Sequence, residues 1–406
     1  MGVPRATVLP LAWVTLACMG VQNKNRAWRG QPKKFDLVCL FVPDFFSVRR
    51  LDGGAVVGDV GPVLGASGQR AMERMLSSAS RVVTERQWRS QAALLKRLVR
   101  ECPDSVNAEF AAWFGSQLDL GAEARLDPPM LSWDIVRLAR PDWVGETERR
   151  LQDHWALLQR RGQVLLAELD LDARLAAGDG ADALRDVVAG IRADPILLPY
   201  WSEASLVHIE TTGTQAAIDQ ARAAACVQAL VSQLGLVQSI QEEARPDIDA
   251  MVELDRKRGW CNPGGVLLQA VRKAFALPTL ESLVATLQTA GCQGPDRSTL
   301  MAWSSGRQFP SSKLWWNLVE ALRLPSDPEF LTLPGPLRLG TLGWAARRVH
   351  GLHQIFGQYW SELKPFVGEA ESLAAWLGPT VSRWHQRWVA RPLPNVEPPR
   401  LPLVVR

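Results

Sequence analysis

The sequence predicts a mainly α, multi-helical protein with one small β element near the N-terminus. Apolar residues recur every three or four positions through most of the chain beyond residue 66, as expected for amphipathic helices. Glycine and proline interrupt this pattern and separate the predicted helices. The composition, 47% hydrophobic and 22% charged over 406 residues, is that of an ordinary globular protein with ample material for a core.

The N-terminal segment, residues 1–66, holds the β candidate. Residues 35–42 form a short apolar run and residues 48–63 are rich in valine and glycine, so together they predict a small strand pair. Residues 8–19 have the length of a signal-peptide core but are too short to cross a bilayer as a helix. Translation starting at Met19 is the competing interpretation. We expect a cytoplasmic protein that does not span a membrane.

Residues 67–255 are predicted to form a helical domain. Residues 146–176 are amphipathic throughout and form one long helix or two. A break is expected near Pro246, because proline disfavours helical geometry at the residue before it. The other expected helices are 69–83, 85–101, 106–118, 132–138, 181–193 and 214–244.

A short helix with clear boundaries is predicted just after residue 295. Asp296 or Ser298 can accept a hydrogen bond from the free amides of a first turn. Leu300 and Trp303 lie three residues apart, so they share one face of the helix. Gly306 can adopt the left-handed conformation that ends a helix.

Helices are also expected on both sides of this short helix. Residues 307–310 form a loop, because Pro310 keeps the residue before it out of helical geometry. Ser311 or Ser312 caps a following helix with apolar positions at Leu314, Trp315, Leu318, Val319, Ala321 and Leu322. Upstream, an apolar helical face comprises Leu280, Leu283, Val284 and Leu287, and a first helix is expected over 265–276.

The segment resembles the XRE or lambda-repressor-like helix-turn-helix family, a bacterial type of DNA-binding domain, over roughly residues 265–324. The resemblance rests on 297–306, which matches the recognition helix and its glycine, and on 310–322, which matches the helix that follows. It implies a domain at 262–325 whose recognition helix lies in the major groove. The residues carried over by position are Arg297, Ser298 and Ala302 toward bases and Arg307 and Gln308 toward phosphates. The alternative from the residues alone is a plain helical hairpin with Trp303, Trp315 and Trp316 in its core.

Two further regions follow this domain. Residues 338–390 are rich in tryptophan and arginine, and Trp384 and Trp388 lie four apart on one helix face. Such tryptophans form a core, or they anchor a protein partner. Residues 391–406 contain five prolines, which predicts an extended tail. The net charge of +4 is mild, so bulk charge does not argue strongly for nucleic acid.

Catalytic and metal-binding motifs are not apparent. The sequence has no phosphate-binding loop, nucleophile elbow or zinc-protease motif. Its six cysteines are scattered without close pairs, which indicates buried thiols and not a zinc site. His350 and His353 share a helix face with few acidic residues nearby, so we interpret them as surface histidines. We expect neither a cofactor nor a metal, and no enzymatic activity.

The sequence therefore predicts a non-catalytic DNA-binding protein, acting as a transcriptional regulator or as the DNA-reading subunit of a larger assembly. Its expected partners are double-stranded DNA and either a second copy of the chain or another protein that contacts the tryptophan-rich helices. The alternative is a non-catalytic helical scaffold or adaptor protein in which the helix-turn-helix is degenerate.

Overall fold

The computed structural model describes residues 146–256, 259–290, 295–310, 318, 322 and 335–394. Within this part of the chain, 78% of the residues are helical and none lies in a strand, which confirms the mainly α class. The predicted N-terminal strand pair, the helices expected before residue 146 and most of the proline-rich tail lie outside the described residues. So does most of the helix predicted after Pro310, although Leu318 and Leu322 are helical and buried as expected.

The apolar periodicity predicted the positions of most described helices better than it predicted where each helix begins and ends. The segment expected as one or two helices forms two. A helix that the periodicity did not predict, α10, lies between α9 and α11. In chain order the α-helices are α7 (Glu146–Glu168), α8 (Leu171–Ala177), α9 (Gly180–Ala193), α10 (Glu203–Thr212), α11 (Gln215–Ile240), α12 (Arg245–Val252), α13 (Pro263–Ala274), α14 (Leu280–Thr289), α15 (Arg297–Ser304), α17 (Gly335–Phe356), α18 (Trp360–Val367) and α19 (Leu373–Ala390).

Three short 3₁₀ turns join some of these helices: η2 (Leu198–Tyr200), η3 (Glu242–Ala244) and η5 (Gly357–Tyr359). The break expected near Pro246 exists, but the proline occupies the first turn of α12. Its missing amide costs little there, because the first amides of a helix have no intrahelical partner. A proline that disfavours helix before itself can therefore start the next helix.

Local sequence explains where several of these helices begin. Ser202, Thr214 and Ser372 accept hydrogen bonds from amides in the first turns of α10, α11 and α19. Between α10 and α11, Gly213 adopts a left-handed conformation with φ of 58°. These caps define the helix boundaries without help from distant contacts.

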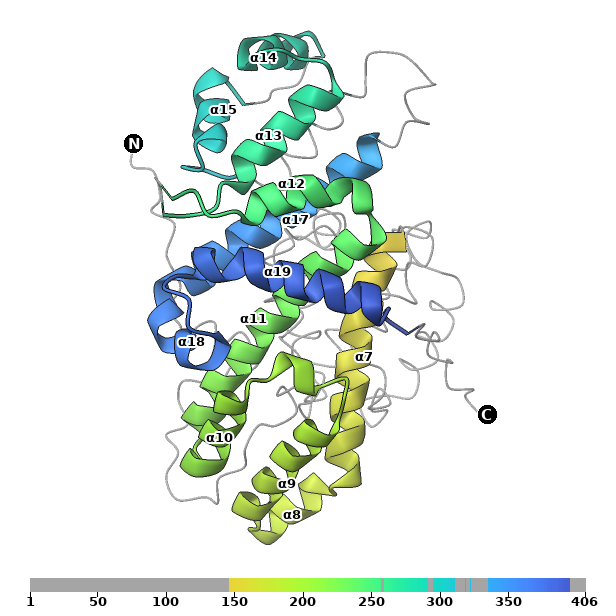
Figure 1. Ribbon diagram of the computed structural model, residues 1–406, viewed down its shortest axis with the longest axis vertical. Helices are drawn as coiled ribbons and strands as arrows, with labels where there is room; N and C mark the ends of the chain where they lie inside the picture. The colour runs from red at the N-terminus through yellow and green to blue at the C-terminus, as the bar shows by residue number, and fades with distance from the viewer. Residues whose placement is uncertain are drawn as a thin grey trace, which may run out of the picture.

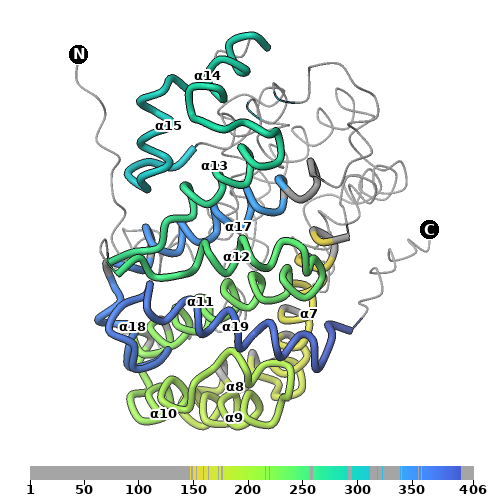
Figure 2. The backbone as a smooth tube through the Cα atoms, turned by 45° about the horizontal axis from the view of Figure 1, so that its top comes forward, coloured from red at the N-terminus to blue at the C-terminus, as the bar shows by residue number. Residues whose placement is uncertain are grey.

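The long helix α11 lies at the centre of the fold, and it contacts α7, α10, α12, α17, α18 and α19. In Figures 1 and 2, α8, α9 and α10 lie at one end of the molecule and α14 and α15 at the other. Residues Ala216–Ile240 of α11 are long and apolar enough to span a bilayer, and an 18-residue window within them has a mean hydropathy of 1.4, but 83% of that window is buried inside the protein. Its apolar character is accounted for by its central position in the core.

The contact between α11 and α19 is unusually close because of Gly235. A Cβ atom there would lie 2.6 Å from the backbone nitrogen of His385. Trp388 packs beside this crossing and donates from Nε1 to Ser232 O, 2.9 Å away. Both Trp384 and Trp388 are buried, so in this fold they belong to the core and are not available as anchors for a protein partner.

Most other described tryptophans are buried too. The exceptions are Trp260, which is 41% exposed, and Trp344, which is half-buried. The two described cysteines, Cys226 and Cys261, are buried, as predicted from their scattered positions. Burial raises the pKa of the Cys261 thiol to about 12, so this residue behaves as a small apolar side chain.

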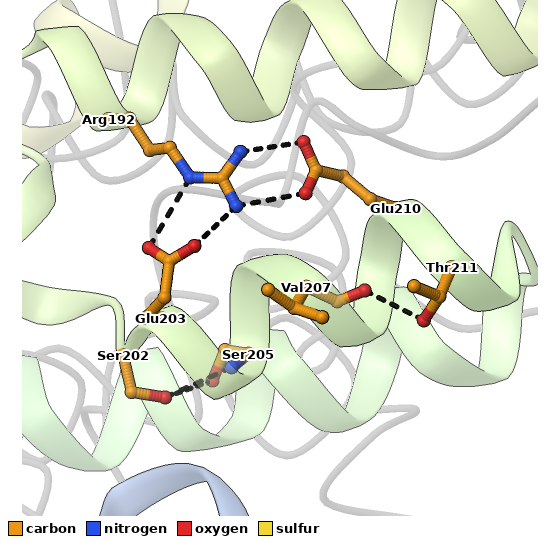
Figure 3. A network of polar contacts seen from close by, with 7 residues as sticks. All are labelled: Arg192, Ser202, Glu203, Ser205, Val207, Glu210 and Thr211. Carbon is orange, nitrogen blue, oxygen red and sulfur yellow. Dashed lines mark hydrogen bonds and ion pairs between the residues drawn. The ribbon is translucent and has the colours of Figure 1, made fainter.

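At the end of the molecule away from α15, an ion-pair network joins α9 to α10. Figure 3 shows the Arg192 guanidinium between two carboxylates, 2.6 Å from Glu203 and 2.7 Å from Glu210. The hydrogen bonds that Arg192 donates to Glu210 and Glu203 raise the pKa of its guanidinium and hold it charged. The network gives α10 a fixed place on α9, although α10 has no amphipathic pattern of its own.

Candidate nucleic-acid interface

The helix α15 is built from the capping signals that the sequence carries. Asp296 is its N-cap and accepts from the Thr299 amide at 2.8 Å, and Ser298 Oγ donates to the same carboxylate. Hydrogen bonds from Thr299 and Ser298 lower the pKa of Asp296. Beyond the helix, Gly306 has φ of 74°, the left-handed conformation predicted for it.

One face of α15 is fixed in the core and the other is open. Leu300 and Trp303 are buried, as their spacing predicted. Arg297 and Ser298 are exposed, and Met301 between them on the same face is 44% exposed. α15 contacts α13 and α14, and Figure 1 shows α14 and α15 away from the bulk of the bundle. The open face of α15 is therefore presented at one end of the molecule.

Arg297 is paired across to the neighbouring helix. Its Nε lies 2.6 Å from Glu281 Oε1 at the start of α14, and both side chains are more than half exposed. The pKa of Glu281 is lowered by a hydrogen bond from its own backbone amide and by Arg297. An exposed pair of this kind contributes little to stability, because water and salt screen it. A phosphate or a guanine edge could replace Glu281 at Arg297 at little cost.

A single asparagine joins α15 to α13. Asn262 is the N-cap of α13 and accepts from the Gly265 amide at 3.1 Å. Its Nδ2 donates to Ser304 O at the end of α15, 2.8 Å away. The same side chain therefore satisfies a free amide of one helix and a free carbonyl of the other. This contact joins residues 42 positions apart in the sequence.

Two glycines allow this approach. A Cβ atom on Gly264 would lie 2.7 Å from Trp303 O, and one on Gly265 would lie 2.8 Å from Ser304 O. Real Cβ atoms do not come this close to a carbonyl oxygen, so the first turn of α13 needs glycine at both positions. The pair therefore holds the C-terminal end of α15 directly on the first turn of α13.

The loop after α15 has a backbone held by hydrogen bonds to α15 and two exposed side chains. The amides of Arg307 and Gln308 donate to Ala302 O at 2.9 and 3.2 Å. Arg307 Nε donates to Ser305 Oγ at 3.0 Å, and both Arg307 and Gln308 are exposed. Phe309 stacks on His350 of α17 with ring centroids 4.7 Å apart. The loop thus carries two exposed polar side chains on a fixed backbone.

The structure brings four of the five predicted site residues to the exposed surface of α15 and its loop: Arg297, Ser298, Arg307 and Gln308. Ala302 is half-buried at the edge of the open face, and its carbonyl accepts the hydrogen bonds from the loop amides. The residue at the centre of that face is Met301, four positions after Arg297. The helical period places Met301 on the same face as Arg297, so the sequence could have predicted it. The resemblance to the helix-turn-helix family indicated Ala302 instead.

A buried polar network joins α7, η2 and α11. His154 Nε2 lies 2.9 Å from Tyr200 Oη and 3.1 Å from Ser232 Oγ. Burial, together with the charge of Arg348, lowers the pKa of His154 to about 3. His154 has no solvent exposure, so this serine and histidine pair cannot reach a substrate from outside. We interpret the network as structural.

Within the described ranges, no group of three or more histidine, cysteine, aspartate or glutamate side chains could hold a metal ion. His350 and His353 lie on α17, where burial lowers the pKa of His350 to about 4. They are more enclosed than the surface histidines that the sequence suggested.

Comparison with known proteins found no relative of this chain. No protein-family model, curated protein or solved structure matches the chain. The function must be argued from the geometry of α13, α14 and α15.

Proposed function

We propose that the chain binds double-stranded DNA through the open face of α15 and the loop after it, as a transcriptional regulator or as the DNA-reading subunit of an assembly. The observation that carries this proposal is the division of α15 into two faces. Leu300 and Trp303 fix the helix to the protein, while Arg297 and Ser298 face solvent. A helix held in this way can enter a major groove with its N-terminal residues toward the bases.

The loop supplies a second kind of contact. Arg307 and Gln308 are exposed on a backbone held by Ala302 O, which suits them to a phosphate. Arginine and serine on the helix suit base edges, where arginine forms paired hydrogen bonds to guanine. The proposal assigns sequence preference to Arg297 and Ser298 and overall affinity to Arg307 and Gln308.

The test is DNA binding by the purified full-length protein. A duplex selected from a random library is titrated at several salt concentrations with wild type and with the Arg297→Ala, Arg307→Ala double variant. We expect the double variant to bind at least about tenfold more weakly. Its salt slope should be smaller by about one for each phosphate that an arginine no longer neutralises.

The chain offers a matched control. Arg185 pairs with Asp182 on α9, and Arg383 donates to Thr380 on α19, so these arginines repeat the local bonding of Arg297 and Arg307 far from α15. The Arg185→Ala, Arg383→Ala double variant removes the same charge and should bind DNA like wild type. If no duplex is selected, or if both double variants lose affinity equally, α15 is not the DNA-binding element.

The scaffold alternative is supported by a different observation. Met301 on the open face of α15 and Trp260 near its end are 44% and 41% exposed. Large apolar side chains of this kind anchor protein interfaces. Under this alternative, Met301→Ala and Trp260→Ala would abolish capture of a protein partner, while the arginine variants would have no effect on DNA.

A further inference from the structure

We propose that a groove beside α13 binds a small amphipathic organic anion, with an apolar body and one carboxylate or sulfonate group. The groove has a volume of about 490 Å³ and is bounded by α13, by the turn into α14 and by the end of α15. Among its lining residues are Leu268, Gln269, Arg272, Lys273, Leu277 and Leu280. The groove is open to solvent, and its volume lies in the range of small-molecule sites, roughly 300–1,000 Å³.

The floor of the groove is apolar. Leu268 is buried, and Leu277 and Leu280 are half-buried at the turn between α13 and α14. Pro278 and Ala276 continue this wall with apolar side chains that are exposed. An aromatic or aliphatic body placed here would remove this surface from water, which is the main source of affinity for a small ligand.

The rim of the groove is cationic. Arg272 and Lys273 are the charged residues among those that line it, and none of the lining residues is acidic. Arg272 donates from Nε to Leu277 O at 3.2 Å and from Nη2 to Pro278 O, so its charge is held at the turn. Lys273 is exposed beside it. A single anionic group on the ligand would complement these two charges.

Two carbonyls in the last turn of α13 accept hydrogen bonds from backbone amides that follow the helix. The Ala276 amide donates to Lys273 O, and the Leu277 amide donates to Arg272 O at 2.8 Å. These bonds satisfy carbonyls that would otherwise repel an anion at a helix C-terminus. Gln269, exposed on the same rim, supplies a neutral amide that can donate to the ligand.

This proposal does not depend on DNA binding. The ligand would contact neither Arg297 nor Ser298, and its test contains no DNA. The groove does border α15 at Ser304, whose carbonyl Asn262 holds. A ligand in the groove would therefore lie next to the last residue of α15.

The experiment uses 1-anilinonaphthalene-8-sulfonate as the probe with the full-length protein, and N-phenyl-1-naphthylamine as its uncharged counterpart. Fluorescence titration gives a dissociation constant for each. We expect the sulfonate to bind wild type about tenfold more tightly than the uncharged probe, and Lys273→Glu to weaken the sulfonate by about tenfold or more. Gln269→Trp, which fills the groove, should weaken both probes.

The matched control is Lys364→Glu on α18, the same change of charge on a lysine away from the groove. It should leave both dissociation constants unchanged. Circular dichroism melting of each variant checks that it is folded. Equal sulfonate binding in Lys273→Glu and Lys364→Glu, or equal affinity of wild type for the two probes, would overturn the proposal.

Discussion

Two helix contacts in this protein depend on glycine, and they differ in what they hold. At the first, α19 crosses α11 at Gly235, where an added Cβ would lie 2.6 Å from the His385 backbone nitrogen. At the second, the first turn of α13 meets the last turn of α15 at Gly264 and Gly265, where an added Cβ would lie 2.7 or 2.8 Å from a carbonyl oxygen. The geometry is alike, but the surroundings are not.

The difference lies in how much apolar surface each contact organises. α19 buries nine of its 18 residues, among them Trp376, Trp384 and Trp388. α15 has eight residues, of which Leu300 and Trp303 are buried, and a polar cap from Asn262 completes its attachment. Burial sets most of the free energy of folding. The α11–α19 contact should therefore control stability, and the α13–α15 contact should control where α15 points.

The largest expected effect tests the first contact. Gly235→Ala puts a Cβ against backbone atoms of α19, which cannot swing aside, and we expect a loss of about 2–4 kcal/mol in the free energy of unfolding. The matched change is Gly190→Ala in α9, where the new Cβ would meet the end of the flexible Leu165 side chain. That variant should stay within about 1 kcal/mol of wild type in urea denaturation. Similar losses for the two variants would contradict the importance of the α11–α19 crossing.

The second prediction concerns the pH dependence of the same core region. The folded pKa of His154 is about 3 against an ordinary 6.5, so the unfolded chain takes up a proton first as the pH falls. The stability is complete above pH 6.5 and decreases below it, by about 1.4 kcal/mol per pH unit until pH 3. Between pH 6.5 and pH 4.5 this is a loss of about 2–3 kcal/mol.

His154→Gln removes the titrating group and retains a polar side chain next to Tyr200 Oη, which lies 2.9 Å from the imidazole. We expect urea midpoints of this variant to fall less steeply between pH 6.5 and pH 4.5 than those of wild type, whatever its stability at pH 7. Parallel curves for the two proteins would show that His154 is already protonated in the fold.

The third prediction tests the α13–α15 contact. Asn262→Ala removes the N-cap of α13 and the donor to Ser304 O, and should cost about 1–2 kcal/mol. Asn262→Asp keeps the acceptor for the Gly265 amide but loses that donor, so it isolates the link to α15. If α15 binds DNA as proposed, both variants should weaken duplex binding beyond what their stability loss explains. If Asn262→Ala lost as much free energy of unfolding as Gly235→Ala, the two contacts would not differ in their contribution to stability, contrary to this prediction.

The elements that were predictable from the sequence are those whose signals are local. The spacing of Leu300 and Trp303, the cap at Asp296 and the left-handed Gly306 define α15 within the eleven residues 296–306, and all three are confirmed. The helix α10 was not predicted although Ser202 and Gly213 mark its ends, because its residues lack an apolar helical period. The contact between Asn262 and Ser304 joins residues 42 positions apart, so no local sequence pattern predicts it.

The site shows the same division. Exposure of Arg297 and Ser298 follows from the helical period once Leu300 and Trp303 are known to be buried. The pairing of Arg297 with Glu281 and the half-burial of Ala302 depend on how α14 and α13 pack against α15, and the sequence does not specify that packing. DNA binding itself stays a prediction, to be decided by the arginine variants.

The smallest expected effect lies at the groove beside α13. Ala276 follows the helix with φ of 50°, a conformation that costs an L-residue roughly 1 kcal/mol and costs glycine nothing. Because glycine also loses more entropy on folding, Ala276→Gly should raise the free energy of unfolding by about 0.5 kcal/mol. Urea denaturation measures this, and Ala270→Gly, in the regular part of α13, should destabilise by about 1 kcal/mol. Destabilisation by both changes would mean that residue 276 is not held in the left-handed conformation, and the cationic rim at Arg272 and Lys273 would then lose the turn that positions it.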